Sequence, residues 1–361
     1  ARSLSHAAMP RARPPISTAL LLPLVLRDLL RNGQSLDCAS WVSTPGAGLL
    51  RAQRMPAKPP WRMPRGTAMH QQLSHVQPLQ HGTADALLSD EDIATYRRDG
   101  VVHLRGVFSP EWLAVMREAF AMAMERPSHY AEYTRKEVPW WNPFESSASE
   151  SNLEMFMDHF FFEEVAARVP AWSAVAEASP AAAIMASLMG SSSAVFFYGQ
   201  FIMKRGGAEH VIPWHQDLPY WKVDGSQIGT VWVALDDMPA EAGVCYIPGS
   251  HRWSHMQQFF DAPPGEATAR SFDVDAGDAI CFDARVVHGS LGNPEAPDRM
   301  HRRVALRFGG DDIVYRLRSG HAPIPTAEVD QTHGLRNGDP LACAAFPRVY
   351  SAAKPLHDGG R

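Results

Sequence analysis

A series of short strand-like runs, separated by turn signals, constrains the fold of this chain more than any other feature. From about residue 194, the helical spacing of apolar residues gives way to runs rich in aromatic and β-branched residues, which favour strands. Turns rich in glycine and proline divide these runs, which cover 195–204, 230–235, 243–247, 279–288 and 303–308. Many short runs of this kind predict an antiparallel sandwich or barrel.

The part of the chain before these runs is expected to be largely helical. Ser89, followed by acidic residues, is typical of a helix N-terminus, and Gly100 is typical of a helix end. Ser109–Pro110 predicts the start of a second helix. Further helices are expected around 163–168 and 181–189. Helices followed by a run of strands predict an α+β fold.

Residues 1–83 differ from the remainder in charge and in proline content. Residues 1–65 carry ten Lys/Arg against two acidic residues, a net charge of 10 − 2 = +8, and ten of the 29 prolines precede residue 84. Proline interrupts helices and sheets, so 1–83 is expected to be a disordered or targeting extension ahead of one domain over 84–361. An Arg-rich, acid-poor leader is typical of a transit peptide. The protein is therefore expected to be cytoplasmic by default, and organellar if this segment is a transit peptide. A non-native extension is the competing interpretation of the segment.

Composition excludes several classes of protein. The net charge of the whole chain is 34 − 39 = −5, which argues against a broad nucleic-acid-binding face. Four scattered cysteines do not predict a disulfide framework or a zinc ribbon. No apolar run approaches the ~20 residues that span a bilayer. We therefore expect a soluble protein without a membrane span.

His215, Asp217 and His288 are the strongest candidates for chemistry. On an extended segment, residues i and i+2 point to the same side, so the imidazole of His215 and the carboxylate of Asp217 can reach one ion. His288 ends a second predicted strand. Two histidines and one carboxylate form the facial triad that binds Fe(II) and leaves coordination positions open. For the triplet 215–217 alone, a core histidine beside a surface aspartate is the competing interpretation.

Ordered motifs run along most of the chain after residue 86, and they comprise Lys204, 214–221 (WHQDLPYW), 231–237 (VWVALDD), 247–251 (IPGSH), 288–290 (HGS) and 302–308 (RRVALRF). Together they closely resemble the phytanoyl-CoA dioxygenase family of 2-oxoglutarate-dependent, non-haem iron oxygenases. The resemblance extends from about Leu87 to near Asp312. It implies a double-stranded β-helix, a cupin-like jelly-roll barrel flanked by helices. Fe(II) would be the metal, with 2-oxoglutarate and O2 as co-substrates.

The resemblance also implies roles for individual residues. His215, Asp217 and His288 match the iron ligands. Trp232, Lys204 and Ser290 match positions that line the 2-oxoglutarate pocket, and Gln216 lies between two ligands and is included with them.

The arginine that binds the distant carboxylate of 2-oxoglutarate is less well defined. The spacing usual in the family would place it at Arg299, but the loop 291–301 looks longer here. Strand alternation puts Arg303 on one face with Ala305 and Arg307, which favours Arg303. Arg299 and Arg302 stay open as alternatives. The competing interpretation is that each of these arginines only lies at a solvated edge strand and binds no ligand.

The sequence therefore predicts a 2-oxoglutarate-dependent dioxygenase that hydroxylates a small organic substrate and releases succinate and CO2. A halogenase on the same barrel and a non-catalytic, cupin-like metal-binding protein are the competing classes. Asp217 argues against the halogenase, in which a small residue replaces the carboxylate. Substrate identity and oligomeric state stay open; the candidates to face a substrate are Tyr198, Gln200, Tyr220 and Arg285.

Overall fold

The computed structural model of this chain describes residues 87–128, 132–135, 153–162, 171–208, 211–257, 265–290, 298–318 and 333–352, with the short pieces 169, 260, 263 and 292–296. The predicted extension 1–83 and the predicted helix 163–168 lie outside these residues. No helix in the described ranges is long and apolar enough to cross a membrane.

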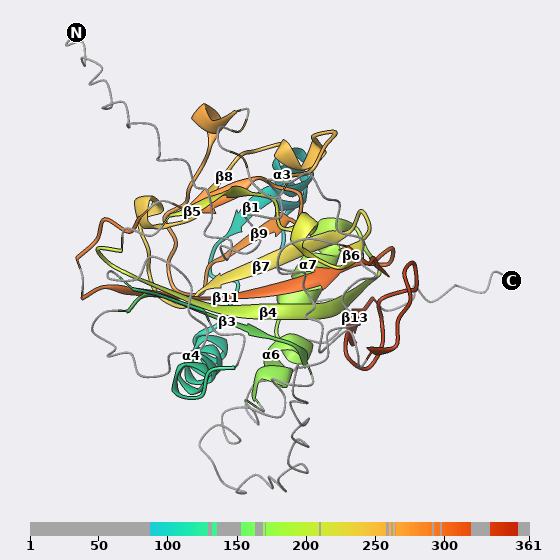
Figure 1. Cartoon of the computed structure of the whole chain (residues 1–361), viewed down its shortest axis with the longest axis horizontal. Coiled ribbons are helices and arrows are strands. Elements are labelled where there is room, and N and C mark those ends of the chain that lie inside the picture. The colour runs from blue at the N-terminus through green and yellow to red at the C-terminus, as the bar shows by residue number, and fades with distance from the viewer. Residues whose placement is uncertain are drawn as a thin grey trace, which may run out of the picture. The chain divides into compact units, whose positions relative to one another are not determined.

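Helices precede most of the strands, as expected for an α+β fold (Figure 1). The helices are α3 (Asp90–Asp99), α4 (Pro110–Glu125), α6 (Ala171–Ala178) and α7 (Ala181–Met189). The strands are β1 (Val101–Leu104), β2 (Glu132–Arg135), β3 (Leu153–Phe160), β4 (Ser193–Arg205), β5 (Ile212–His215), β6 (Val223–Asp224), β7 (Ile228–Ala234), β8 (Cys245–Tyr246), β9 (Ala279–Asp283), β10 (His288–Ser290), β11 (Met300–Gly309), β12 (Val314–Tyr315) and β13 (Arg348–Ser351).

The first predicted helix forms as its end signals indicate. Ser89 and Asp92 make a reciprocal capping box at the N-terminus of α3, which satisfies two N–H groups that the helix cannot. Gly100 ends the helix with a left-handed φ of 75°, a conformation that glycine adopts without strain.

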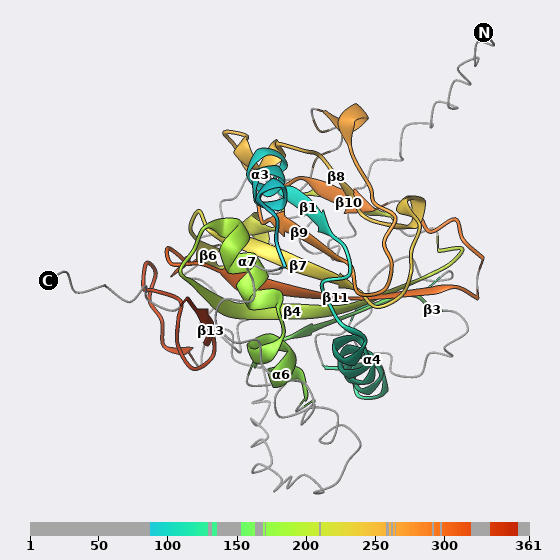
Figure 2. The ribbon, with the colours of Figure 1, turned by 180° about the vertical axis from the view of Figure 1, so that it is seen from behind.

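One large antiparallel sheet forms the centre of the structure. Its strands follow the order β1-β9-β7-β11-β4-β3-β2, and β13 also pairs with β4. The long pairing of β11 with β4, over ten residue pairs, joins segments about a hundred residues apart in the chain. Both strands contain predicted runs, and they lie at the middle of the sheet (Figures 1 and 2).

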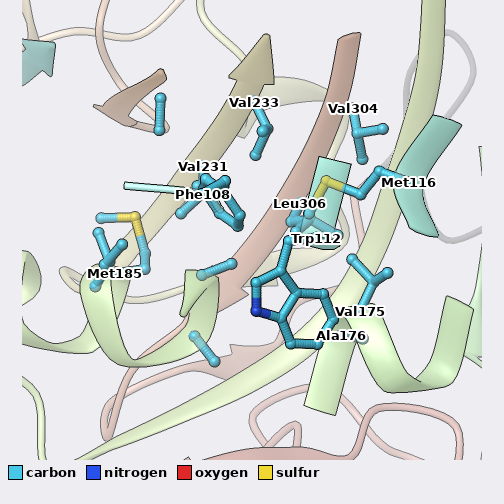
Figure 3. Packing of buried hydrophobic residues seen from close by; sticks show 14 of the residues in the cluster. Phe108, Trp112, Met116, Val175, Ala176, Met185, Val231, Val233, Val304 and Leu306 are labelled. Carbon is cyan, nitrogen blue, oxygen red and sulfur yellow. The ribbon is translucent and has the colours of Figure 1, made fainter. Parts of the chain in front are cut away.

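Helices α4, α6 and α7 cover one face of the large sheet. Alternate apolar residues of β7 and β11 point toward these helices, because successive side chains of a strand point to opposite faces. Figure 3 shows this contact, in which the strand residues Val231, Val233, Val304 and Leu306 face Trp112, Met116, Val175, Ala176 and Met185. The residues that alternate with them along the two strands include Trp232, Arg303 and Arg307, which therefore face the opposite side of the sheet.

A second antiparallel sheet, in the order β5-β10-β8, lies on that opposite side. Both sheets contribute side chains to one cavity, so the cavity lies between them. Two antiparallel sheets enclosing a site, with helices outside, form the jelly-roll architecture that was expected. The predicted double-stranded β-helix is confirmed.

The predicted strand 279–288 is in fact two strands in different sheets. Strand β9 ends at Asp283, whose backbone carbonyl accepts a hydrogen bond from Val286 N–H at 2.9 Å, closing a tight turn. Strand β10 then starts at His288 and pairs with β5 and β8 instead. The chain turns a corner between sheets here, as strands of orthogonal sandwiches do. His288 thus begins a strand, whereas the sequence placed it at the end of one.

Strand β3 is a second difference from expectation. It pairs with β4 along Met155–Phe160, although the sequence showed no strand signal there. Phe160 packs against Trp172 with the ring centroids 4.4 Å apart. It also fills the space above Gly199, where the Cβ of any larger residue would lie 2.1 Å from the Phe160 ring. Phe160 is therefore a core residue of the helix-covered face.

Candidate functional site

Three side chains that can bind a metal, His215, Asp217 and His288, converge between the two sheets. His215 ends β5 and His288 begins β10, and the two residues are direct partners in the antiparallel pairing of these strands. The Nε2 atoms of His215 and His288 lie 3.7 Å and 3.8 Å from Oδ1 of Asp217. One ligand atom from each residue lies within 4.8 Å of the others, an arrangement found nowhere else in the described ranges.

Asp217 reaches this point through a turn and not through strand alternation. Strand β5 ends at His215, and Asp217 has helical backbone angles (φ −74°, ψ −42°) at the start of a 3-10 helix, Leu218–Tyr220. Pro219 stands in the first turn of that helix, where its fixed φ and missing N–H are favourable. The expectation of one extended segment is therefore wrong for Asp217, although its carboxylate still meets both imidazoles.

Backbone carbonyls fix the orientation of both histidines. Nδ1 of His215 lies 2.8 Å from the carbonyl oxygen of Pro213, and Nδ1 of His288 lies 2.9 Å from that of Val286. When Nδ1–H donates to a carbonyl, Nε2 carries the lone pair, which is the arrangement of metal-ligating histidines. Oδ2 of Asp217 is buried and has no hydrogen-bond partner among the described residues. This donor set fits a divalent metal ion.

The protonation states at the site also favour a metal. Burial would raise the pKa of Asp217, but the charge of His288, a hydrogen bond from His215 and the charge of Arg307 lower it to about 2. Burial, followed by the charge of His215, lowers the pKa of His288 to about 4. At neutral pH Asp217 is a carboxylate and His288 is a neutral imidazole, the forms that bind metal.

The three residues open into a cavity of about 290 Å³ between the sheets. Aromatic and aliphatic side chains make up most of its lining, with a few polar groups, as is typical of small-molecule sites. Besides the ligand cluster, the lining includes Tyr198, Gln200, Trp232, Ser290, Arg303 and Arg307.

Of the three candidate arginines, only Arg303 lines this cavity within the described part of the chain. It is 2% exposed, and its Nε and Nη1 atoms are buried without a hydrogen-bond partner among the described residues. Burial lowers the pKa of Arg303 to about 10, so the side chain is still a cation at neutral pH. Its guanidinium lies 5.8 Å from the centre of the Trp232 ring. A buried cation with unsatisfied donors is suited to an anionic ligand.

Arg302 and Arg299 lie elsewhere. Arg302 makes a two-pronged ion pair with Asp236, with N–O distances of 2.9 Å and 2.7 Å. The side chain of Arg299 is 56% exposed, and its nearest carboxylate is Glu295 at 3.9 Å. Arg299 lines a separate polar pocket with Arg117 and Asp298.

The other residues expected near 2-oxoglutarate divide into two groups. Trp232 and Ser290 line the cavity. Lys204 is fully buried behind Ser290, with its Nζ 3.4 Å from the Ser290 hydroxyl. Gln216 points away, because its amide donates to the carbonyl of Arg285 at 2.6 Å and its amide oxygen accepts from Gln257 N–H at 2.9 Å. Gln216 holds the backbone between two ligands in place.

Three of the four residues expected to face a substrate line the cavity, namely Tyr198, Gln200 and Tyr220. The fourth, Arg285, instead pairs with Asp283 and nearby carbonyls. Arg307 also lines the cavity, and strand alternation with Arg303 is the signal that could have identified it. The segments 136–152 and 319–332 lie outside the described residues.

The fold and the site together define a double-stranded β-helix oxygenase with a His-Asp-His cluster. The sequence matches the model of the phytanoyl-CoA dioxygenase family over residues 96–300. The chain belongs to this family, whose members use Fe(II), 2-oxoglutarate and O2. Phytanoyl-CoA dioxygenase domain-containing protein 1 of Danio rerio is 24% identical over 259 residues, which cover 59% of this chain and 88% of that protein.

Solved structures show the same fold. The non-haem, α-ketoglutarate-dependent carbocyclase SnoK from nogalamycin biosynthesis has a TM-score of 0.57 and 22% identity, covering 75% of this chain and 99% of its own. The epimerase SnoN from the same biosynthesis has a TM-score of 0.56 and 22% identity, covering 74% and 97%. EctD from S. alaskensis, solved with 2-oxoglutarate and 5-hydroxyectoine, has a TM-score of 0.50 and 20% identity, covering 74% and 89%.

Proposed function

We propose that this protein is an Fe(II)- and 2-oxoglutarate-dependent dioxygenase that hydroxylates a small organic substrate. The observation that carries the proposal is the convergence of His215, Asp217 and His288, with both Nδ1 atoms engaged and both Nε2 atoms directed to one point. The overall reaction is R–H + 2-oxoglutarate + O2 → R–OH + succinate + CO2. The iron, when bound, supplies the activation of O2 and of the keto acid.

The residues of the chain position the reactants in this reaction. His215, Asp217 and His288 hold the metal, and their one negative charge leaves the site positive enough to attract a dicarboxylate. Arg303 binds the distant carboxylate of 2-oxoglutarate with its unsatisfied N–H groups. Trp232 packs beside it and excludes water, which strengthens the charge interaction. Ser290, with Lys204 behind it, completes this end of the cavity.

A binding protein without turnover would not require this arrangement. Burying Arg303 with N–H donors that lack acceptors lowers the stability of the protein, unless an anion accepts hydrogen bonds from them. A non-catalytic barrel gains nothing from that cost, whereas a co-substrate carboxylate compensates for it.

Asp217 favours hydroxylation over halogenation. A halide would need the coordination position that this carboxylate occupies in the proposed site. We expect the wild-type protein to form a hydroxylated or further oxidised product even in high chloride, and mass spectrometry of the reaction identifies the product. Predominant chlorinated product would contradict the proposal.

The decisive experiment measures succinate release. The iron-loaded protein is given 2-oxoglutarate, O2 and a panel of metabolites, and succinate formed above the substrate-free rate identifies a substrate. A mass increase of one oxygen atom in that substrate supports hydroxylation. A product isomeric with the substrate would indicate epimerisation, and loss of two hydrogen atoms would indicate ring closure; either product would contradict hydroxylation while preserving iron and 2-oxoglutarate dependence.

A further inference from the structure

A second buried arginine, Arg307, faces the same cavity as Arg303. It is 5% exposed, and its guanidinium lies 4.7 Å from the centre of the Tyr198 ring. One Nη2 hydrogen is donated to the side-chain oxygen of Gln200, and Nη1 donates to the carbonyl of Ala305 at 3.1 Å. These contacts fix the plane of the guanidinium. Its Nε is buried and has no hydrogen-bond partner among the described residues.

The proposed iron and co-substrate leave the charge of Arg307 unbalanced. Asp217 is the one carboxylate among the described residues that line the cavity. The positive charges of Fe(II) and Arg303 equal the negative charges of Asp217 and the two carboxylates of 2-oxoglutarate. Among the groups that line the cavity, Arg307 is therefore the surplus cation, since Lys204 is buried behind Ser290 and is not part of the lining. A desolvated cation is stable only with an anion or with complete hydrogen bonding.

Arg307 and Arg303 enter the cavity from different places along β11. They are four positions apart, which corresponds to about 13 Å between their backbones in an antiparallel strand. Arg303 is opposite Ala234 and Ile202, whereas Arg307 is opposite Thr230 and Tyr198. The cavity therefore has two cationic positions along one strand.

Arg307 and Arg303 contact different walls of the cavity. Arg307 lies against Tyr198 and Gln200 of β4, whereas Arg303 lies against Trp232 of β7. A ligand held by Arg307 therefore meets a different wall from a ligand held by Arg303, as separate substrate and co-substrate sites require.

We propose that Arg307 binds a carboxylate of the substrate, so that the substrate is a small organic acid. This inference rests on the proposed function. The surplus of one positive charge favours a monoanion, and a planar carboxylate matches the planar guanidinium. Tyr198 and Gln200 are positioning residues, because they hold the plane of Arg307 and act through it.

The test compares acids with their uncharged amides. The full chain, loaded with Fe(II) and 2-oxoglutarate without oxygen, is titrated with benzoate and benzamide, phenylacetate and phenylacetamide, and hexanoate and hexanamide. Binding is measured calorimetrically and by the change in the visible band of the iron–2-oxoglutarate complex. We expect at least one acid to bind about tenfold or more tightly than its amide, the effect of one good charge-assisted contact.

Variants assign that preference to Arg307. Arg307→Gln should reduce the acid–amide ratio to about one, while the affinity for 2-oxoglutarate changes less than about threefold. Arg307→Lys should restore part of the ratio, because it returns the charge without the fork. Arg302→Gln is the matched control on the same strand, since Arg302 is paired with Asp236 outside the cavity and should keep the full ratio.

Several results would overturn the inference. One is that no acid binds the wild-type protein more tightly than its amide does. This measurement needs no variant, so it does not depend on whether a variant folds. Another is that the preference persists in Arg307→Gln. A third is that Arg307→Gln loses 2-oxoglutarate binding while Arg303→Gln keeps it, which would exchange the two roles. Failure of the wild-type protein to bind Fe(II) and 2-oxoglutarate would instead contradict the proposed function.

Discussion

Buried ionisable side chains at this site are held in the forms that a metal and an anion require. His288 is kept neutral by burial and Asp217 is kept ionised by the charges around it. Burying these groups without a ligand lowers the stability of the protein unless a neighbouring residue compensates, because isolated charges and unsatisfied donors are costly to bury. Ligands that complete the site should therefore stabilise the fold.

The first prediction concerns the ligands themselves. Replacing His215 or His288 by alanine should abolish Fe(II) binding and the visible band that 2-oxoglutarate produces with bound iron, because two protein ligands hold a first-row divalent ion poorly. Iron content after anaerobic desalting measures the first effect and absorbance the second. Full iron occupancy in either variant would show that the metal is bound elsewhere.

The second prediction concerns the pH dependence of the metal-free protein. The pKa of His288 is about 4 in the folded chain, against about 6.5 when unfolded, so the unfolded state binds more protons between these values. Protonation of His288 in the unfolded state therefore lowers the free energy of unfolding as the pH falls from 6.5 towards 4. Between pH 8 and pH 5, wild type should lose about 2 kcal/mol more stability than His288→Leu, as measured by urea unfolding after chelation. Parallel losses in both proteins would contradict the shifted pKa.

The third prediction concerns Arg303. Arg303→Ala should weaken 2-oxoglutarate binding by on the order of 2–5 kcal/mol, because it leaves a desolvated carboxylate without its partner. Iron binding should be nearly intact, since Arg303 is not a ligand. Arg299→Ala and Arg302→Ala serve as controls, as both side chains lie outside the cavity. A silent Arg303→Ala with a strong loss in Arg299→Ala would reverse the assignment.

Strand β11 joins the core and the site through the two-residue period of its side chains. Val304, Leu306 and Phe308 are buried among residues that pack with the helices, whereas Arg303 and Arg307 face the cavity. The same strand therefore carries stability on one face and ligand recognition on the other.

The fourth prediction separates these two faces. Leu306→Ala should lower the free energy of unfolding by about 2–5 kcal/mol, because it removes a fully buried side chain from a packed core. The affinity of the folded protein for 2-oxoglutarate should be unchanged. Met300→Ala, at the 37% exposed start of the same strand, should have little effect on either quantity. A Leu306→Ala protein with normal stability and poor 2-oxoglutarate binding would place Leu306 in the cavity instead.

The fifth prediction concerns the extent of the functional unit. Every described helix and strand, and every described cavity residue, follows Ser89. Deleting residues 1–80 should therefore leave thermal stability, iron binding and 2-oxoglutarate turnover unchanged in vitro. A large fall in melting temperature on truncation would show that the leader stabilises the domain.

Much of the architecture could be predicted because its signals are local. Ser89 and Gly100 mark the ends of α3, and the aromatic, β-branched runs mark β4, β7 and β11. The alternation in 302–308 already distinguished the face of Arg303 from that of Arg302. Such patterns depend on backbone geometry over a few residues, and the sequence contains that information directly.

Other features depend on contacts between distant segments, and only the tertiary structure decided them. The corner after Asp283 moves His288 into the second sheet, opposite His215, and a short turn brings Asp217 to both. Arg302 forms an ion pair with Asp236 and is therefore not the arginine proposed to bind 2-oxoglutarate. Arg307 is a buried cation because β4 and β7 flank its strand. The sequence alone determined which side chains can bind a metal or an anion, and which strand face each of them occupies. Because strand pairing is non-local, only the packing of the two sheets determined which of these side chains share a cavity.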